Sequence, residues 1–263
     1  MDLGIEGNAA VVAASSSGLG KAAATALARE GANVVVNGRD EERLADAVRD
    51  IEETATGEVV GHATDLTVKS EAEGLVGRAV DEFGRLDHLV TNAGGPPSKP
   101  FAETTDEEWY DAYDLLVMST VRLVREAIPH LRADGGGSVV CSTSHSVKEA
   151  IDGLVLSNSV RMSVIGLEKT LSRELAPEIR VNAVMPGAHE TDRMVYLIQN
   201  AVDRGEFDSY EESHEAWTDD IPAGDLGPPA EFGNCVAFLC SDRASFITGE
   251  AVMIDGGDAR SNL

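Results

Sequence analysis

Short apolar runs alternate along this chain with longer segments of helical periodicity. The runs predicted as strands cover residues 9–14, 33–37, 58–63, 86–91, 138–143, 179–185 and 250–254. The second and fifth runs are apolar almost throughout, which is typical of strands covered on both faces. Because helices of about ten residues or longer separate neighbouring strands, the connections are crossovers and the strands are parallel. The pattern predicts an α/β protein with a doubly wound parallel seven-stranded sheet.

One segment breaks this alternation. Residues 191–227 contain the acidic run from Asp208 to Glu215 and the helix-ending pair Ile221-Pro222. An excursion of this length is typical of a lid that covers a substrate, and the alternative is a solvated acidic loop. No repeat or linker divides the rest of the chain, and 263 residues, 43% of them hydrophobic, suffice for one core. We therefore expect residues 1–263 to form a single domain with a lid at about 191–227.

The charge balance bears on partners and on the surroundings of the protein. The chain has 46 acidic and 21 basic residues, a formal net charge of −25, which disfavours nucleic-acid binding. Self-repulsion of this size is screened at molar salt, where the Debye length is about 3 Å. The balance is therefore typical of a halophile that accumulates salt, and the alternative is a merely acidic protein from a mesophile.

Hydropathy and cysteine usage bear on location. The chain has no run of roughly 18 uncharged apolar residues, and its first residues lack a basic region followed by an apolar one. We therefore expect a cytoplasmic protein that does not enter a membrane. Cys141, Cys235 and Cys240 have neither the spacing of a redox pair nor that of a metal site. We expect all three to be reduced packing residues, and we expect no metal.

The first predicted strand runs into a turn that contains glycines and begins a helix. The segment is Ala13-Ala-Ser-Ser-Ser-Gly-Leu-Gly20. Glycines in such a turn let backbone N–H groups approach a pyrophosphate at the positive end of the helix. The residues expected to bind a dinucleotide here are Ser15, Ser17, Gly18, Leu19 and Gly20. Because Ala14 replaces the first glycine of the motif, a different small ligand stays open as an alternative.

The end of the second strand bears on the choice of dinucleotide. An NAD-binding chain places an Asp or Glu there, about 20 residues after the glycines, to bind the ribose 2′-hydroxyl. This chain has Gly38 at that place, followed by Arg39. A guanidinium binds phosphate through a fork of donors, so Arg39 predicts NADP(H) in preference to NAD(H). The alternative is that Arg39 pairs with Asp40 or Glu41.

Three further segments carry a resemblance to a known family. The fourth strand ends in Thr91-Asn-Ala-Gly94, and Phe246-Ile-Thr-Gly249 and Asp255-Gly-Gly257 lie near the C-terminus. With the glycine turn, these segments resemble the motifs of short-chain dehydrogenase/reductases, and the similarity runs over residues 7–257. It implies a Rossmann fold and is nearest to the 3-oxoacyl-carrier-protein reductase branch. The cofactor contacts that it implies are Asp65, Leu66, Asn92, Ala93, Gly94, Pro186, Gly187 and Thr191.

The resemblance also implies positions for the family's catalytic Asn, Ser, Tyr and Lys. Ser144 follows the fifth strand, as the family serine does. Thirteen residues later the tyrosine position holds Ser157, and one helical turn further the lysine position holds Arg161. The asparagine position falls on Leu116. The resemblance therefore implies a degenerate tetrad that retains only Ser144.

These replacements differ in their chemical consequences. Arg161 keeps a positive charge and several donors, so we expect it to serve the catalytic site and to bind the cofactor ribose. Ser157 is shorter than a tyrosine and a far weaker acid than a phenol of pKa about 10, so we do not expect it to replace the tyrosine. His189 is the preferred replacement acid, because an imidazole with a pKa near 6.5 can protonate an alkoxide. His145, beside Ser144, is the second histidine candidate.

Other candidates come from the predicted lid. Tyr196 and Tyr210 could bring a phenol to the site from above. For the two histidines and the two tyrosines, a packing or surface position is the alternative.

The resemblance implies that helices at 106–131 and 157–176 pair subunits, so we expect a homotetramer.

Together these inferences predict an NAD(P)(H)-dependent oxidoreductase. It would transfer hydride reversibly between a carbonyl and an alcohol of a small-molecule substrate, with a non-standard proton donor. The alternative is a dinucleotide-binding pseudoenzyme that acts as a sensor or a scaffold.

Overall fold

The computed structural model of this chain describes residues 1–133 and 135–261, and its centre is one parallel β-sheet. The strands are β1 (Ala9–Val12), β2 (Asn33–Gly38), β3 (Val59–Ala63), β4 (His88–Thr91), β5 (Gly137–Ser142), β6 (Ile179–Pro186) and β7 (Ala251–Ile254). Their order in the sheet is β3-β2-β1-β4-β5-β6-β7, and every neighbouring pair is parallel. The predicted doubly wound seven-stranded sheet is confirmed.

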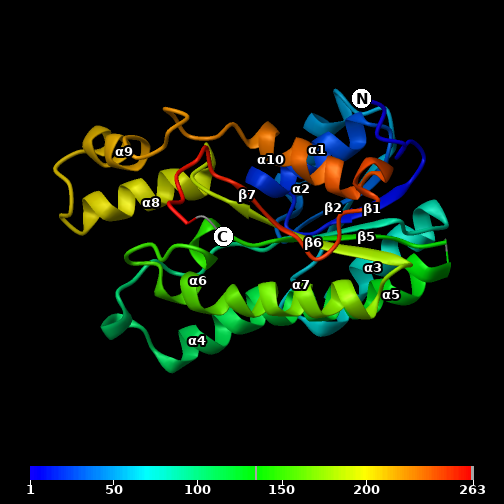
Figure 1. The fold of residues 1–263 in the computed structure, drawn as a ribbon, viewed down its shortest axis with the longest axis horizontal. Coiled ribbons are helices and arrows are strands. Elements are labelled where there is room, and N and C mark those ends of the chain that lie inside the picture. The colour runs from blue at the N-terminus through cyan, green and yellow to red at the C-terminus, as the bar shows by residue number, and fades with distance from the viewer. Residues whose placement is uncertain (134, 262–263) are drawn as a thin grey trace.

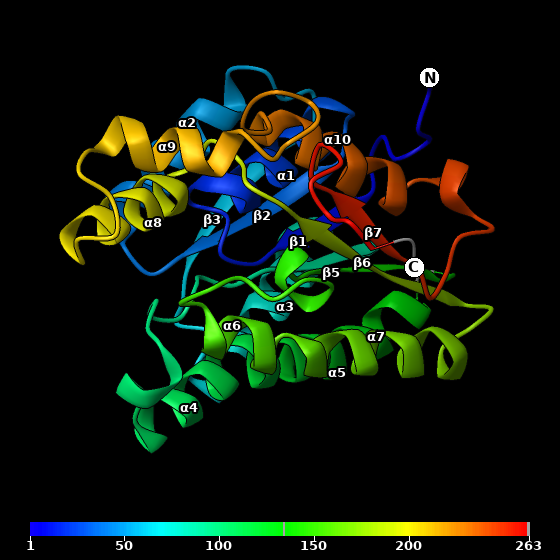
Figure 2. The ribbon, with the colours of Figure 1, turned by 60° about the vertical axis from the view of Figure 1, so that its left-hand side comes forward.

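Helices cover both faces of this sheet (Figure 1). They are α1 (Gly18–Arg29), α2 (Glu41–Glu52), α3 (Lys69–Phe83), α4 (Asp106–Tyr113), α5 (Ser119–Ala133), α6 (Val155–Val160), α7 (Met162–Glu174), α8 (Asp192–Asp203), α9 (Tyr210–Thr218) and α10 (Pro229–Cys240). Figure 2 shows α1, α2 and α10 on one side and α3, α5 and α7 on the other. Each layer contributes its apolar face to a separate buried cluster against the sheet. Because helices cover both faces of the sheet, the side chains on both faces of each central strand are apolar.

The strand order reverses between β1 and β4, which lie side by side although two strands separate them in sequence. Loops after β1 and after β4 leave the sheet in opposite directions there, so their ends open a crevice at the carboxyl edge. Ligands of doubly wound sheets bind in such a crevice. The fold therefore places the glycine turn and the Asn92-Ala-Gly94 segment at its opening.

The predicted lid contains two helices, α8 and α9, and is not a plain solvated loop. Met194, Ile198, Ile221 and Leu226 are buried together in a small cluster of their own. In Figure 1 the two helices extend past the carboxyl edge of the sheet. The segment therefore has enough apolar packing to stand over the crevice as an ordered unit.

The three cysteines lie in or near the two apolar layers that cover the sheet. All three cysteines are free thiols; Cys141 and Cys240 are buried, whereas Cys235 is only partly buried against the α1, α2 and α10 layer. The expected packing role therefore holds fully for the first two. Within residues 1–133 and 135–261, no helix has the length and apolar character needed to cross a membrane.

Candidate functional site

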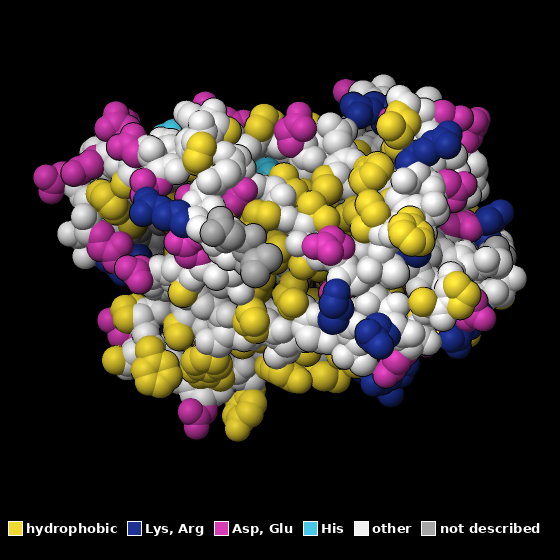
Figure 3. All heavy atoms as spheres, viewed as in Figure 1, with side chains coloured by type: hydrophobic (Ala, Val, Ile, Leu, Met, Phe, Trp, Pro, Cys, Tyr) yellow, Lys and Arg dark blue, Asp and Glu magenta, His cyan; other side chains and the backbone are white. Residues whose placement is uncertain are grey.

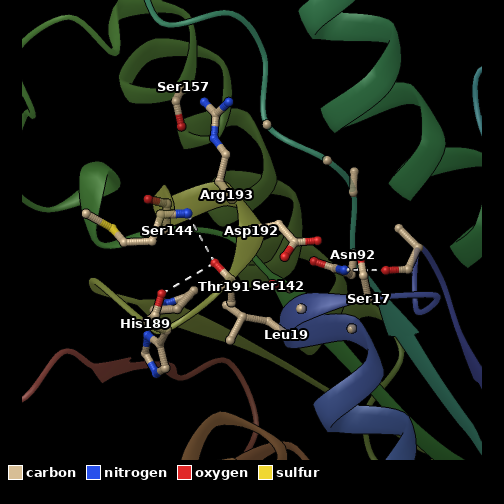
Figure 4. A pocket seen from close by; sticks show the side chains of 18 of the residues that line it. Ser17, Leu19, Asn92, Ser142, Ser144, Ser157, His189, Thr191, Asp192 and Arg193 are labelled. Atoms are coloured by element: carbon tan, nitrogen blue, oxygen red, sulfur yellow. Dashed lines mark hydrogen bonds between the residues drawn. The ribbon is translucent and has the colours of Figure 1, made fainter. Parts of the chain in front are cut away.

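A cavity of about 840 Å³ follows the carboxyl ends of the strands and continues under α8 (Figure 4). It brings together nearly all the predicted site residues. Those that line it are Ser17, Gly18, Leu19, Gly20, Arg39, Asp65, Leu66, Asn92, Ala93, Gly94, Ser144, Ser157, Arg161, Pro186, Gly187, His189 and Thr191. Because they come from the ends of successive strands, one extended ligand can contact all of them.

Ser15 is the predicted cofactor residue that does not line this cavity. Its side chain is fully buried, and its hydroxyl donates to the carbonyl of Val12 (2.5 Å) and accepts from the N–H of Asn37 (2.9 Å). The hydroxyl is therefore committed to holding β1 and β2 together. Ser15 therefore lies outside the cavity, and the neighbouring Ser16, which the sequence did not single out, lines it instead.

Ala14 keeps the shape of the glycine turn despite its side chain. Its φ is +46°, which makes it the one residue other than glycine with positive φ in the described part of the chain. Its N–H donates to Asn37 Oδ1 (2.9 Å), and its carbonyl accepts from Asn92 Nδ2 (3.1 Å). The same carbonyl would lie 2.2 Å from a Cβ at Gly20, so that glycine is required. Two asparagines therefore hold the left-handed turn that a glycine would adopt more easily.

The start of α1 fits a phosphate ligand. Its N-cap, Ser17, makes no side-chain hydrogen bond to the first turn, so no side chain caps the N–H groups that face the cavity. Gly18 has φ +53°, and a Cβ there would contact the methyl of Thr191 at 3.6 Å. An uncapped helix N-terminus inside a long cavity suits a pyrophosphate. The residues present therefore fit a dinucleotide, with Ser17 to Gly20 at its phosphates.

The end of β2 presents Arg39 to solvent at the mouth of the cavity. Its side chain is 78% exposed, and its Nη1 lies 3.9 Å from Asp65 Oδ2, so it pairs with neither Asp40 nor Glu41. The carboxylate of Asp65 accepts from the N–H (2.9 Å) and hydroxyl (2.8 Å) of Thr67, and these bonds lower its pKa. Arg39 is thus an exposed cation, paired with Asp65 only at long distance, that can turn toward a ligand.

The serine and arginine of the degenerate tetrad bond to each other. Ser157 is buried, and its hydroxyl accepts from Arg161 Nε (3.1 Å). Arg161 also donates from Nη1 to the carbonyl of Thr143 (3.1 Å) and from Nη2 to that of Gly94 (3.4 Å). Burial, together with the charge of Arg193, lowers the pKa of Arg161 to about 10. Three of the five donors of a guanidinium are thus engaged within the protein, which leaves two for a ligand.

Ser144 and Leu116 show what the other two tetrad positions hold. Ser144 lines the cavity, and its hydroxyl accepts from the N–H of Ser146 (3.1 Å). Leu116 lies in the buried core, within a π-helical turn at Asp114–Met118, and its neighbour Leu115 faces the cavity. Position 116 therefore offers no polar group for a proton relay.

His189 lies at the cavity edge, but its ring packs into the protein. Its Nδ1 is 3.1 Å from the carbonyl of Gly187, and its ring meets Phe232 edge-on with centroids 6.3 Å apart. Nε2 is buried without a hydrogen-bond partner, and burial lowers the pKa of this histidine. Figure 4 shows the ring directed away from Ser144 and Ser157. This geometry matches the packing alternative better than the role of an acid.

His145 has a different environment. It lines the cavity next to Ser144, and its Nδ1 lies 3.2 Å from the carboxylate of Asp258, while Nε2 lies 3.9 Å from Glu149. The two carboxylates fix the orientation of the ring, although Nε2 is buried and makes no hydrogen bond. Neither Tyr196 nor Tyr210 is among the residues that line the cavity. Of the described candidates, His145 therefore combines acid chemistry with a place at the site.

The cavity residues that the sequence did not reveal include four with polar or charged side chains: Ser16, Arg43, Arg193 and Asp258. Arg43 of α2 pairs with Asp192 of α8 across the cavity mouth, and Asp258 reaches His145 from the C-terminal segment. Such contacts join residues more than 100 positions apart, so no local pattern reveals them. Arg193 alone had a local signal, since it is a cation two residues after Thr191 in the predicted lid.

Comparison with known proteins gives matches over nearly the whole chain. A family profile described as enoyl-(acyl carrier protein) reductase matches residues 13–258. Dehydrogenase/reductase SDR family member 4 from Caenorhabditis elegans is 30% identical over 256 residues, which cover 96% of this chain and 95% of that protein. The human protein of the same name is 33% identical over 252 residues, which cover 94% and 86%.

Solved structures give the same result. L-Sorbose reductase from Gluconobacter frateurii, complexed with NADPH and L-sorbose, has a TM-score of 0.92 and 32% identity, covering 99% of this chain and all 100% of that one. A variant of actinorhodin polyketide ketoreductase with NADPH has a TM-score of 0.91 and 30% identity, covering 97% and 98%. Both neighbours thus share the fold and a recognisable sequence over their full length.

Proposed function

Because this chain belongs to the short-chain dehydrogenase/reductase family, we propose that it is an NADP(H)-preferring oxidoreductase that interconverts a carbonyl and an alcohol. The single observation that carries the proposal is the continuous cavity that joins the α1 N-terminus, Arg39, Asp65 and Ser144. When bound, the dinucleotide would supply or accept the hydride. The NADPH in two similar reductase structures supports the same cofactor here.

The proton must come from a group other than tyrosine. Among the described residues that line the cavity, none is a tyrosine or a lysine. We propose that Ser144 holds the substrate oxygen and that His145, with Asp258 behind it, donates or accepts the proton. Arg161 would stabilise negative charge on the oxygen from behind Ser157. His189 is the less favoured donor because its ring packs against Phe232.

A second candidate is a dinucleotide-binding pseudoenzyme. The mutual bond of Ser157 and Arg161, and the bonds of Arg161 to two backbone carbonyls, favour it, since such groups also serve as structural supports. The two candidates agree on cofactor binding and differ on turnover. Loss of turnover in His145→Gln, with cofactor affinity unchanged, would support the enzyme.

Cofactor titration in molar potassium chloride tests the proposal. We expect NADPH to bind about tenfold or more tightly than NADH, because Arg39 forms a charge-assisted pair with the 2′-phosphate. Arg39→Ala should remove this preference, whereas Arg49→Ala, at an exposed position of α2 outside the cavity, should keep it. Equal affinities in the unmodified protein would contradict NADP(H) preference. Absence of binding by either dinucleotide would contradict both candidate functions.

A further inference from the structure

Two arginines in the cavity have no acidic partner. Arg161 is buried and Arg193 is half-buried, and in the described part of the chain no carboxylate lies within 4.0 Å of either guanidinium. Two of the carboxylates that line the cavity are engaged elsewhere, since Asp192 pairs with Arg43 and Asp258 with His145. The cavity therefore contains two cations that the protein itself does not neutralise.

The backbone of one short segment holds both guanidinium groups. Arg161 Nη2 donates to the carbonyl of Gly94 (3.4 Å), and Arg193 Nη2 donates to that of Pro96 (2.9 Å). Gly95 lies between them, and a Cβ there would come within 2.7 Å of Arg193 Nε. The Arg193 Cζ also lies 4.9 Å from the ring centroid of Tyr196. The guanidinium is therefore held by a backbone carbonyl, a close glycine and an aromatic ring, and its Nε and Nη1 make no hydrogen bond to the described residues.

This arrangement is costly without a ligand. Burial lowers the pKa of Arg193, and burial with the charge of Arg193 lowers that of Arg161, so the two groups repel each other. The chain is rich in acidic residues, with 46 Asp and Glu against 21 Lys and Arg. Among the other partly buried arginines, Arg122 pairs with Asp114, and Arg180 donates to four backbone carbonyls around the end of α10. Arg161 and Arg193 differ in that both face one cavity without a carboxylate partner, and an anion between them would relieve both costs.

We propose that the substrate of this site carries an anionic group, a carboxylate or a phosphate, which Arg193 binds with support from the charge of Arg161. The inference rests on the proposed function, because it concerns the substrate end of the same cavity. Figure 4 shows Arg193 extending from the start of α8 toward the side of the cavity where Ser157 lies. A small oxo acid or oxo phosphate would then place its carbonyl at Ser144 and its anionic group at Arg193.

Calorimetric titration of two anions and a neutral analogue tests this proposal. The probes are acetoacetate, inorganic phosphate and methyl acetoacetate, added at constant chloride to protein saturated with NADP⁺ and to cofactor-free protein. We expect at least one anion to bind and the ester not to bind. Preference for acetoacetate would identify a carboxylate substrate, and preference for phosphate a phosphorylated one.

Three variants locate the binding site. Arg193→Met removes the charge, and Gly95→Ala keeps it but displaces the flexible side chain that lies on this residue. Each should weaken anion binding by about tenfold or more, as expected for loss of a charge-assisted hydrogen bond. Arg173→Met removes the same charge at an exposed position of α7 outside the cavity and should change the affinity less than twofold.

Three results would overturn the proposal. The first is a dissociation constant above about 1 mM for both anions. The others are an affinity for the ester equal to that for the anions, and an unchanged anion affinity in Arg193→Met. A loss of NADP⁺ affinity in that variant, with anion binding intact, would assign Arg193 to the cofactor phosphates. Failure of the proposed function would appear separately, as absence of dinucleotide binding or turnover, while the cofactor-free titration still reports on the anion.

Discussion

At the scale of single residues, Ala14 adopts a backbone conformation that glycine tolerates better. Its φ of +46° costs a residue with a Cβ about 1–2 kcal/mol. We predict that Ala14→Gly raises the free energy of unfolding by about 1 kcal/mol, because the turn is kept by bonds to the backbone of residue 14. Chemical denaturation measures the change. Ala22→Gly, inside α1, should lower the same free energy by about 1 kcal/mol, and equal effects at both positions would contradict the prediction.

Ser157 and Arg161 allow a test of whether the scaffold still presents the family geometry. Ser157 lines the cavity, so a longer side chain there extends into it. We predict that Ser157→Tyr combined with Arg161→Lys raises turnover of simple ketones by about tenfold or more, since general acid catalysis contributes about 10²- to 10⁴-fold. Ser157→Phe with Arg161→Lys supplies the ring without the hydroxyl. If both double variants have the same activity, the site no longer places a tyrosine hydroxyl at residue 157 where it can donate a proton to the substrate.

Residues in the motifs could be predicted from the sequence, because the turn after a strand has local requirements. The glycine turn and Arg39 follow from such requirements, Asn92 follows from the family resemblance, and all of them line the cavity. Side-chain direction inside the turn could not be predicted: the hydroxyl of Ser15 is buried against β1, whereas Ser16 lines the cavity. Contacts such as that of Arg193 with Pro96, 97 positions apart, depend on the folded lid.

At the scale of elements, the strands could be predicted and their ends could not. Burial on both faces sets the apolar runs, but β1 ends at Val12, two residues before its predicted end, because the left-handed turn begins at Ala14. β4 begins at His88, two residues later than predicted. The preceding Asp87 uses its carboxylate to accept from the N–H of Ala9 (2.8 Å). Hydrogen bonds from side chains to the backbone thus set the ends of the strands, and hydropathy does not detect them.

Helix α7 carries an element-scale prediction about pH. Glu168 is buried, its Oε1 has no hydrogen-bond partner, and burial raises its pKa to about 7, from 4.5 when exposed. The folded state therefore holds this proton more tightly than the unfolded state does. The contribution of Glu168 to the free energy of unfolding should fall as the pH rises from about 4.5 to about 7 and stay constant above that range.

Glu168→Gln should remove this dependence. Relative to the unmodified protein, the variant should gain stability between pH 4.5 and 7, by up to about 3 kcal/mol from the pKa difference. Denaturant unfolding at a series of pH values gives the free energy of unfolding of the variant and of the unmodified protein. Because the other carboxylates are the same in both, their contributions cancel in the difference between these two free energies. Glu174→Gln, at an exposed position of the same helix, should give a difference that does not vary with pH. If the difference in free energy of unfolding between Glu168→Gln and the unmodified protein does not change with pH, the pKa of Glu168 is not raised by folding and the prediction is wrong.

At the scale of the whole molecule, exposed apolar side chains support association of several copies. Phe101, Tyr110 and Tyr113 around α4 are 70%, 75% and 46% exposed, and Met162 at the start of α7 is 49% exposed. In Figure 3 hydrophobic side chains gather at the lower left, where Figure 1 places α4. We predict a homotetramer at molar potassium chloride, measured by light scattering. Tyr110→Glu should reduce the mass and Val68→Glu, at the start of α3, should not; a monomeric unmodified protein would contradict the prediction.

The net charge of −25 gives the last prediction, a strong dependence of folding on salt. Carboxylates are spread over the face in Figure 3, and the chain has 46 Asp and Glu against 21 Lys and Arg. Salt also weakens ion pairs, but several pairs in the described residues are exposed on both sides, as Arg49–Asp46 is, and each exposed pair contributes only about 0–1 kcal/mol. Screening of the general repulsion should therefore prevail as the Debye length falls from about 10 Å at 0.1 M to about 3 Å at 1 M.

We predict that the melting temperature rises by about 10 °C or more over this range, which corresponds to a few kcal/mol for a domain of this size. Sorbitol at equal osmolality screens no charge and should reproduce little of the rise, whereas a flat response to potassium chloride would favour an acidic protein adapted to low salt.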